Sequence, residues 1–241
     1  VRDLLTHTSG LASSGIASRT TSRLAPRSTS VDLASYIPTL GAVPLDFQPG
    51  TQWQYSLLAG IETLGRIVEI TSGMSFDQFL QERLFGPLKM NDTSFVVPDD
   101  KLPRLVTLYE RTDDGQLTRQ DETPSWLDTE TLFSGGGGLY STTSDYMRFA
   151  QMLLNRGELD GERILGIRTV ELMASNHVGE LYGPAANRAE GLGFGLTVEV
   201  VLDPVLANTR RGKGSFSWGG AFGTYFWVDP FNDLVGVMMI Q

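Results

Sequence analysis

Hydrophobic positions in the first third of the chain follow a helical period. Between Ser56 and Thr71 apolar side chains recur at three- and four-residue spacing, which is typical of a helix with one buried face. These apolar positions are Leu57, Ile61, Leu64 and Val68. Gly73 stands where a glycine commonly ends a helix, and Pro49-Gly50 predicts a turn ahead of it. The pattern therefore predicts a helix over residues 56–71.

Two further helices are predicted by polar residues that precede apolar runs. Ser75 with Gln78 matches a capping box, and Gly86-Pro87 ends that helix. Thr142 with Asp145 begins the second helix, and Gly157 stops it. The apolar residues expected on their buried faces are Phe76, Phe79, Leu80 and Leu84, then Met147, Phe149, Met152, Leu153 and Leu154.

The segment from Ala12 to Ser30 is rich in Ser, Thr and Arg and has little periodicity, so it is predicted to be a surface loop. A short helix is expected over 31–37. Thr29 with Asp32 would cap its start, and Pro38 would stop it.

The last part of the chain favours strands, because β-branched and aromatic residues dominate it. Strands are predicted over 193–202, 215–221, 224–228 and 234–240. The Asp229-Pro230-Phe231-Asn232-Asp233 connection is tight, so the last two strands should be antiparallel neighbours. Helices followed by adjacent strands predict an α+β fold. We expect one structural unit with a mostly helical region at 1–157 and a sheet region at 158–241.

Composition narrows the classes of function. Hydrophobic residues make up 41% of the 241 residues, which is enough for a sizeable core. The formal net charge of −9 disfavours nucleic acid and anionic membranes as partners, because both select a basic face. Cysteine is absent and there are two histidines, which leaves little scope for a thiolate or histidine metal site. No metal or organic cofactor is implied. Compartment and oligomeric state stay open.

Four segments along the chain carry recognisable sequence motifs. They are Leu4 to Leu11, Phe47 to Ser56 with its continuation to Gly65 and Phe85 to Thr93, Gly136 to Thr142 with Asp145 and Phe149, and Ser217 to Ala221 with Gly223, Thr224 and Asp229-Pro230. In kind and order they resemble the serine β-lactamase-like hydrolases, which include class C β-lactamases, D-alanyl-D-alanine carboxypeptidases and β-lactamase-fold esterases. The resemblance implies the serine β-lactamase/penicillin-binding-protein-like fold, an antiparallel sheet with flanking helices plus a mostly helical region.

Enzymes of this kind acylate a serine that lies one helical turn before a lysine, in a Ser-x-x-Lys motif. The residues three before the lysines of this chain are not serine, so the motif does not occur in it. The pairs are Gly86 and Lys89, Pro98 and Lys101, and Arg210 and Lys213. The resemblance places the motif ahead of Val1, and family members usually continue past Gln241. We therefore expect the chain to be an interior portion of a longer protein.

Tyr55 is the leading catalytic candidate. It matches the tyrosine of the family's Tyr-x-Asn motif, which the resemblance implies takes a proton from the serine and returns one to the leaving group. A nearby lysine ammonium would favour the phenolate that this role requires. The alternative from the residue alone is a packed tyrosine at the start of a helix.

Two substitutions favour an ester over a β-lactam as substrate. Leu57 stands where class C β-lactamases have asparagine, and leucine cannot hydrogen-bond a substrate amide. Trp218 stands in place of the lysine of the family's Lys-Thr-Gly, so a substrate carboxylate loses its cation. The alternatives are that Leu57 only begins the apolar stripe and that Trp218 is a packed strand residue.

The residues after Trp218 are also candidates. Gly219 and Gly220 have no side chain, which would let an acyl group approach the strand closely. By the resemblance, the backbone N–H of Ala221 forms half of an oxyanion hole. The alternative is a strand with a glycine bulge. Phe133 either lines an acyl pocket or covers the core.

His7, Thr8 and Ser9 suggest a serine–histidine pair at first sight. Residues two apart in a tight turn rarely aim at each other, and Gly10 indicates that this run ends a helix. The four glycines at 135–138 are not followed by Gly-Lys-Ser/Thr, so a phosphate loop is not predicted.

The sequence thus predicts a serine hydrolase that acts through an acyl-enzyme, and specifically a carboxylesterase for small acyl esters. Within the same fold, β-lactamase, D-amino-acid peptidase and acyltransferase activity stay open, on a small ester or amide substrate. A hypothesis of another class is a non-catalytic, penicillin-binding-protein-like module that binds a ligand or peptide.

Overall fold

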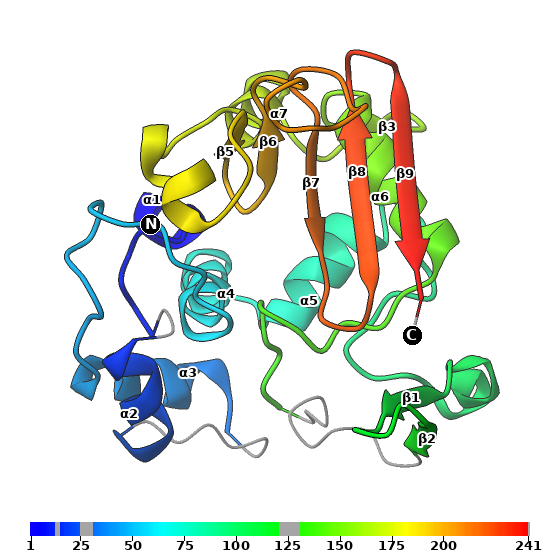
Figure 1. Ribbon diagram of the computed structural model, residues 1–241. Helices are drawn as coiled ribbons and strands as arrows, with labels where there is room; N and C mark the ends of the chain where they lie inside the picture. Colours follow the sequence, from blue (N-terminus) through cyan, green and yellow to red (C-terminus); the bar gives the residue numbers. More distant parts are fainter. Residues whose placement is uncertain (13–14, 25–30, 121–130, 241) are drawn as a thin grey trace.

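The computed structural model describes residues 1–12, 15–24, 31–120 and 131–240. Figure 1 shows the order and arrangement of its elements. The helices are α1 (Arg2–Leu5), α2 (Ile16–Leu24), α3 (Leu33–Tyr36), α4 (Ala59–Ser72), α5 (Phe76–Leu80), α6 (Thr143–Leu154) and α7 (Ile167–Met173). The strands are β1 (Leu108–Arg111), β2 (Leu117–Gln120), β3 (Glu158–Leu159), β4 (Glu162–Arg163), β5 (Leu192–Phe194), β6 (Glu199–Val201), β7 (Phe216–Gly219), β8 (Thr224–Asp229) and β9 (Leu234–Met239). Short 3₁₀ and π segments lie at Ile37–Ala42, Gln81–Phe85, Asp99–Arg104, Gly179–Leu181 and Gly183–Ala186.

The strands near the end of the chain form one antiparallel sheet in the order β5-β6-β7-β8-β9. Strands β8 and β9 pair from Thr224↔Met239 to Asp229↔Leu234, so the predicted antiparallel pair is confirmed. The range 193–202, predicted as one strand, is instead the hairpin of β5 and β6. The chain reverses near Thr197, whose φ of 66° is in the left-handed region. Apolar residues continue through both arms, which hid the reversal from the sequence pattern.

The main hydrophobic core lies between one face of this sheet and α6. Phe216, Val228 and Val200 supply the sheet side, and Met152 and Leu153 supply the helix side. Figure 1 shows α6 lying behind β8 and β9. The predicted α+β class is therefore confirmed. The division at residue 157 stays a prediction, and α6 shares one core with the sheet that follows it.

Helix α6 begins as its capping residues predicted. The Thr142 hydroxyl accepts a hydrogen bond from the Asp145 N–H at 3.2 Å. The buried Asp145 carboxylate in turn accepts from the Asp92 N–H at 2.7 Å and from the Thr93 hydroxyl at 2.9 Å. One carboxylate therefore ties the start of α6 to a loop far away in the sequence.

Helix α4 ends as predicted, with Gly73 at a φ of 72°, but it begins later than Ser56. Leu57 consequently lies outside the helix and is 57% exposed, so the predicted apolar stripe is wrong at its first position. The fully buried helix residues are Ala59, Gly60, Glu62 and Gly65, and Ile61, Leu64 and Val68 are half-buried. Small residues allow neighbouring segments to approach on the buried side, which hydrophobicity alone did not indicate.

Helix α5 has a different cap from the predicted one. Ser75 makes no side-chain capping hydrogen bond, so the Ser75–Gln78 capping box is not formed. Instead, a carboxylate oxygen of Glu69 in α4 accepts from the Phe76 N–H at 3.2 Å. The cap of α5 therefore comes from the neighbouring helix α4. The capping-box motif considers only residues next to the helix start, so it could not indicate Glu69.

The start of the chain is more helical than expected. The segment predicted as a loop from Ala12 to Ser30 contains α2. The helix predicted at 31–37 is α3, where the Asp32 carboxylate accepts from the Ser35 N–H at 2.8 Å. Thr29 lies outside the described residues. Pro38 ends only the α-helix, because the chain continues as a 3₁₀ helix.

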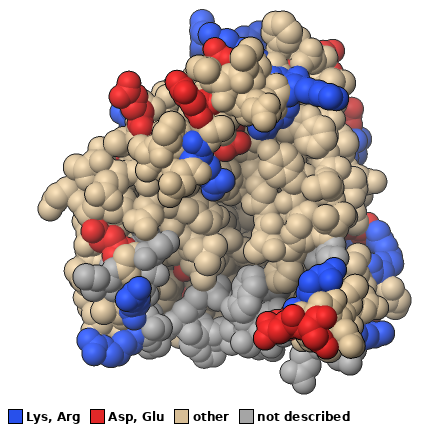
Figure 2. Space-filling view, viewed as in Figure 1, with Lys and Arg blue, Asp and Glu red and all other residues tan. Residues whose placement is uncertain are grey.

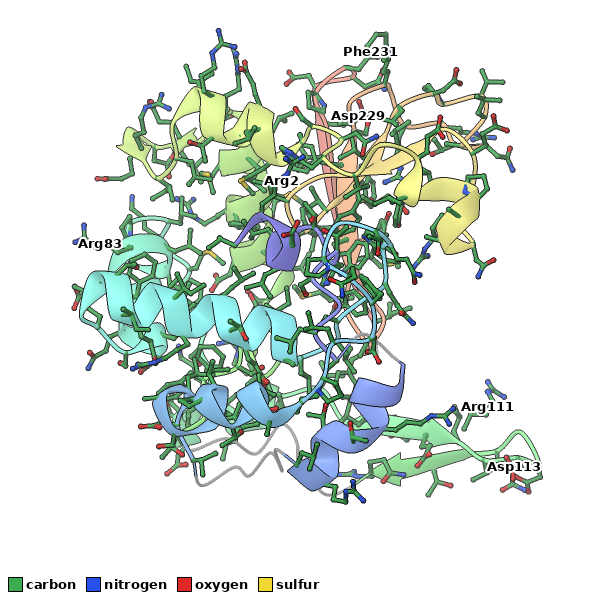
Figure 3. The ribbon with its side chains drawn as sticks, turned by 90° about the vertical axis from the view of Figure 1, so that its left-hand side faces the viewer. Arg2, Arg83, Arg111, Asp113, Asp229 and Phe231 are labelled. Atoms are coloured by element: carbon green, nitrogen blue, oxygen red, sulfur yellow. The ribbon has the colours of Figure 1, made fainter. Side chains whose placement is uncertain are left out.

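The antiparallel pair β1–β2 was not predicted. Figure 3 shows it projecting from the rest of the molecule, with Asp113 at its outer end. Its residues are almost all exposed, so no alternation of buried and exposed positions marked it in the sequence. Among the described residues, no helix is long and apolar enough to cross a membrane.

We predict that Asp145→Ala lowers the free energy of unfolding by about 2–4 kcal/mol, because it leaves the Asp92 N–H and the Thr93 hydroxyl without their acceptor. Glu180→Ala, at an exposed position, is the control and should stay within about 0.5 kcal/mol of the parent protein. Urea denaturation measures both. An equal, small effect of the two substitutions would contradict the bridging role of Asp145.

Candidate active site

Tyr55 lies in the turn that leads into α4, and its neighbour Ser56 holds this turn in place. The Ser56 hydroxyl donates to the Leu11 carbonyl at 2.7 Å and accepts from the Gly60 N–H at 3.0 Å. Ser56 thereby supplies the side-chain cap at the start of α4. Tyr55 itself is half-buried, and within the described part of the chain its phenolic oxygen has no hydrogen-bond partner. The hydroxyl is thus available to a bound molecule.

Trp218 lies beside Tyr55, with ring centroids 5.5 Å apart and a tilt of 48°. Strand β6 pairs with β7 only as far as Glu199↔Ser217. Among the described strands, β7 therefore has no neighbour on that side from Trp218 onward. The structure brings these two candidate residues together at a free strand edge, and their catalytic and binding roles stay predictions.

Gly219, Gly220 and Ala221 continue along this edge and are exposed. The Gly220 N–H donates to the Thr224 carbonyl at 2.8 Å, and a Cβ at Gly220 would lie 2.2 Å from the Thr224 hydroxyl. A side chain at 220 would therefore fit only if the Thr224 side chain moved, a constraint that the sequence did not reveal. The Ala221 N–H has no partner among the residues that the structure describes. Its place in an oxyanion hole stays a prediction.

Leu57 and Phe133 are the remaining candidate residues. Leu57 is largely exposed, and a Cβ at Gly136 would come within 2.8 Å of its carbonyl oxygen. The ring of Phe133 packs on buried Phe95, with centroids 5.2 Å apart. Phe133 therefore covers a separate aromatic cluster, and a place for it in an acyl pocket stays a prediction.

His7 contacts Tyr55, which the sequence did not predict. Its imidazole is 2% exposed and meets the Tyr55 ring edge-on at 4.6 Å between centroids. The ring also lies nearly parallel to Trp218, at 6.5 Å. Its Nδ1 accepts from the Ser56 N–H at 3.2 Å, so the neutral ring carries its proton on Nε2. The Leu4 to Leu11 run was a signal, but the partners of His7 lie too far along the chain to be found by spacing.

Burial determines the protonation of His7. Removal from water lowers the pKa of its imidazole from 6.5 to about 4. The ring lies among the aromatic side chains of Trp53, Phe194 and Tyr55, which offer little stabilisation to a charged imidazolium. His7 is therefore neutral near pH 7.

A polar network behind β7 was also missed. Ser217 and Tyr225 hydrogen-bond each other at 2.8 Å and both accept from Arg211. Arg211 also lies 3.5 Å from the carboxylate of Glu199, which accepts from the Tyr182 hydroxyl at 2.8 Å. Because Ser217 alternates with Phe216 and Trp218 along the strand, this network lies on the face opposite the main core. The alternation in the sequence was the available signal.

Figure 2 shows a hollow between the sheet and the side that carries α1 and α4, with most charged side chains around its periphery. The described residues include no group of three or more His, Cys, Asp or Glu side chains that could hold a metal ion. Among the described residues, the arrangement therefore offers a phenol, an indole and the Ala221 backbone N–H for chemistry.

We predict that His7 makes the protein less stable as the pH falls. Between pH 6.5 and about 4 the unfolded histidine takes up a proton and the folded one does not, so the free energy of unfolding falls with pH. The free energy of unfolding should be lower by roughly 3 kcal/mol at pH 4 because of His7, and this loss should be absent above pH 7. Urea titrations of the protein and of His7→Asn measure it. The difference in the free energy of unfolding between the protein and His7→Asn should be constant from pH 7 to 8. Below pH 6.5 it should change in favour of the variant, because only the parent protein loses stability through His7. A difference that does not change with pH would contradict the prediction.

The sequence and the fold are similar to those of known proteins. The beta-lactamase family model matches residues 1–241. An uncharacterized protein of Mycobacterium tuberculosis (strain CDC 1551 / Oshkosh) is 37% identical over 252 residues, which cover 100% of this chain and 62% of that relative. Esterase EstB of Burkholderia gladioli is 29% identical over 252 residues, covering 95% of this chain and 61% of the esterase.

Among solved structures, "EstCE1, a hydrolase with promiscuous acyltransferase activity" superimposes with a TM-score of 0.82 and 26% identity. The match covers 99% of this chain and 66% of that one. The chain spans about three fifths of the length of the curated relatives above. The family match extends over every residue and agrees with the sheet, the helices and the placement of the motifs, so the chain belongs to the beta-lactamase family.

Proposed function

We propose that this chain forms part of a serine hydrolase that works through an acyl-enzyme and takes small acyl esters. The observation that carries the proposal is the Tyr55 ring 5.5 Å from the Trp218 indole, at the point where β7 loses its strand neighbour. A phenol with an unengaged hydroxyl can move a proton there, and the indole offers an apolar wall to an acyl or alkyl group. Similarity to Esterase EstB and to the hydrolase EstCE1 supports the proposal.

Each group has a defined role in this reaction. A serine and lysine from a Ser-x-x-Lys segment outside these 241 residues supply the nucleophile and an ammonium. Tyr55 takes the serine proton as the Oγ–carbonyl bond forms and returns it to the leaving alcohol. The Ala221 N–H, together with the N–H of the serine, binds the oxyanion. A water molecule then cleaves the acyl-enzyme by the same route in reverse.

The side chains around Tyr55 favour esters over β-lactams. A β-lactam carries a carboxylate, and Trp218 provides no charge to pair with it. Leu57 presents an exposed apolar side chain where an amide would bind the amide of a penicillin or peptide. Neither residue hinders a neutral ester.

Acyl transfer to an alcohol is a second candidate. The edge formed by Gly219, Gly220 and Ala221 is exposed, so an alcohol can approach an acyl group held there. Similarity to EstCE1, a hydrolase with promiscuous acyltransferase activity, supports this candidate too. In such a reaction the alcohol replaces water as the second nucleophile, and the roles of Tyr55 and Ala221 are unchanged.

We predict that the full-length protein hydrolyses p-nitrophenyl butyrate and is labelled by a fluorophosphonate. Tyr55→Phe should lower kcat by ~10²-fold or more, because it removes the proton carrier. Tyr109→Phe, the same change at an exposed tyrosine of β1, should leave kcat unchanged. Absence of both labelling and hydrolysis would favour the non-catalytic binding module instead.

We also predict that the kcat/KM for p-nitrophenyl butyrate exceeds that for nitrocefin. Trp218→Lys should narrow this ratio, because the lysine supplies a cation for the cephalosporin carboxylate. Steady-state kinetics on both substrates measure the ratio. A preference of the unmodified protein for nitrocefin would contradict the assignment to esters.

A further inference from the structure

His7 contacts Tyr55 and both of its chain neighbours. The Gln54 N–H donates to the His7 carbonyl at 3.0 Å, and the Ser56 N–H donates to His7 Nδ1 at 3.2 Å. The imidazole and the phenol ring between them meet at 4.6 Å, with 61° between their planes. One residue therefore holds the backbone before Tyr55, the backbone after it and the ring itself.

The conformation of His7 is itself unusual. Its φ of 54° lies in the left-handed region, which a residue with a Cβ adopts at a cost. The surrounding segment is well held and offsets this cost, since Gly50 donates to the Thr8 carbonyl at 2.8 Å and Asp46 donates to the Gly10 carbonyl at 2.8 Å. From this left-handed turn the imidazole contacts the rings of both Tyr55 and Trp218.

His7 does not have the geometry of a general base. Its Nδ1 is occupied by the Ser56 N–H, so it cannot be oriented by a carboxylate at that atom as in a serine–histidine–aspartate triad. Ser9, the nearby serine, is buried and its hydroxyl accepts from the Leu11 N–H at 3.3 Å. The chemistry that His7 offers is that of a neutral acceptor and a rigid ring.

We propose that His7 is the positioning residue of Tyr55, acting through the Nδ1 acceptor and the edge of its ring. This inference rests on the proposed function, in which Tyr55 carries the proton. A misplacement of about 1 Å can cost roughly 100-fold in rate, so the residue that fixes the phenol controls turnover without touching the substrate.

Two substitutions separate the two contacts. His7→Asn keeps an acceptor near the position of Nδ1 and tolerates the left-handed backbone, but it loses the ring edge. His7→Phe keeps a ring and loses the acceptor, which leaves the buried Ser56 N–H unpaired. We expect His7→Phe in the full-length enzyme to lower kcat by roughly 10- to 100-fold with KM changed less than about 3-fold, and His7→Asn to retain more of the rate.

A double-mutant cycle with Tyr55→Phe tests whether His7 acts through Tyr55. If it does, His7→Phe should change kcat by less than about 2-fold once the phenol hydroxyl is gone, because the two changes remove the same contribution. Ser9→Ala, in the same buried segment, is the matched control and should have the same effect on kcat with and without the Tyr55 hydroxyl. If His7→Phe does not fold, His7→Gln replaces it, because its amide reaches the Nε2 position and not Nδ1.

An equal loss of kcat from the His7 substitution in both backgrounds would overturn the inference and leave His7 a purely structural residue. Unchanged kcat in the Tyr55-containing enzyme would overturn it as well. Failure of the proposed function gives a different result, namely no ester hydrolysis by the unmodified protein or full activity of Tyr55→Phe alone.

Discussion

The backbone of residues 5–11 is the constraint on which the candidate site depends. It is hydrogen-bonded to the loop before α4 through the carbonyls of His7, Thr8 and Gly10, and to the sheet through the Leu5 carbonyl, which accepts from the Thr197 N–H at 2.8 Å. Residues 5–11 therefore join the loop that carries Tyr55 to the β5–β6 hairpin of the sheet. The φ of Gly10 is 73°, and a Cβ there would lie 2.3 Å from the Phe47 carbonyl oxygen. Only glycine lets the two segments lie this close.

The aromatic cluster around His7 joins this constraint to the chemistry. Phe194 of β5 lies 5.3 Å from Trp218 and 5.5 Å from His7, so the hairpin of β5 and β6 packs on the same rings that surround Tyr55. These ring contacts exclude water, which leaves the His7 imidazole uncharged. They also surround the Tyr55 phenol with uncharged rings. On the other face of β7, Arg211 and Glu199 hold the strand by ionic and polar contacts. Glu199 also accepts from the Tyr182 hydroxyl, and the Tyr182 ring packs on Phe194, so this polar network adjoins the aromatic cluster.

Capping rules correctly predicted helix ends where the capping residue lies within a few positions of the atoms it satisfies. Thr142 and Gly73 cap helices because the atoms they satisfy lie within a few residues. The predictions failed where a distant segment decides: Glu69 caps α5, and the chain reverses at Thr197 within a continuous apolar run. The proximity of Tyr55 and Trp218 followed from the family resemblance and not from spacing. The contact between His7 and Tyr55 could not be predicted, because a buried contact between distant segments leaves no periodic pattern.

The turn after β7 has a consequence for how its sequence can vary. Because a Cβ at Gly220 would lie 2.2 Å from the Thr224 hydroxyl, the two positions are sterically coupled. A side chain at 220 fits only when the Thr224 side chain adopts another rotamer, residue 224 has lost its hydroxyl or the turn has shifted, and a shift would move the Ala221 N–H. Substitutions at 220 and 224 should therefore be accepted as a pair, so an evolving or engineered enzyme would alter its oxyanion-binding turn by correlated steps and not one residue at a time.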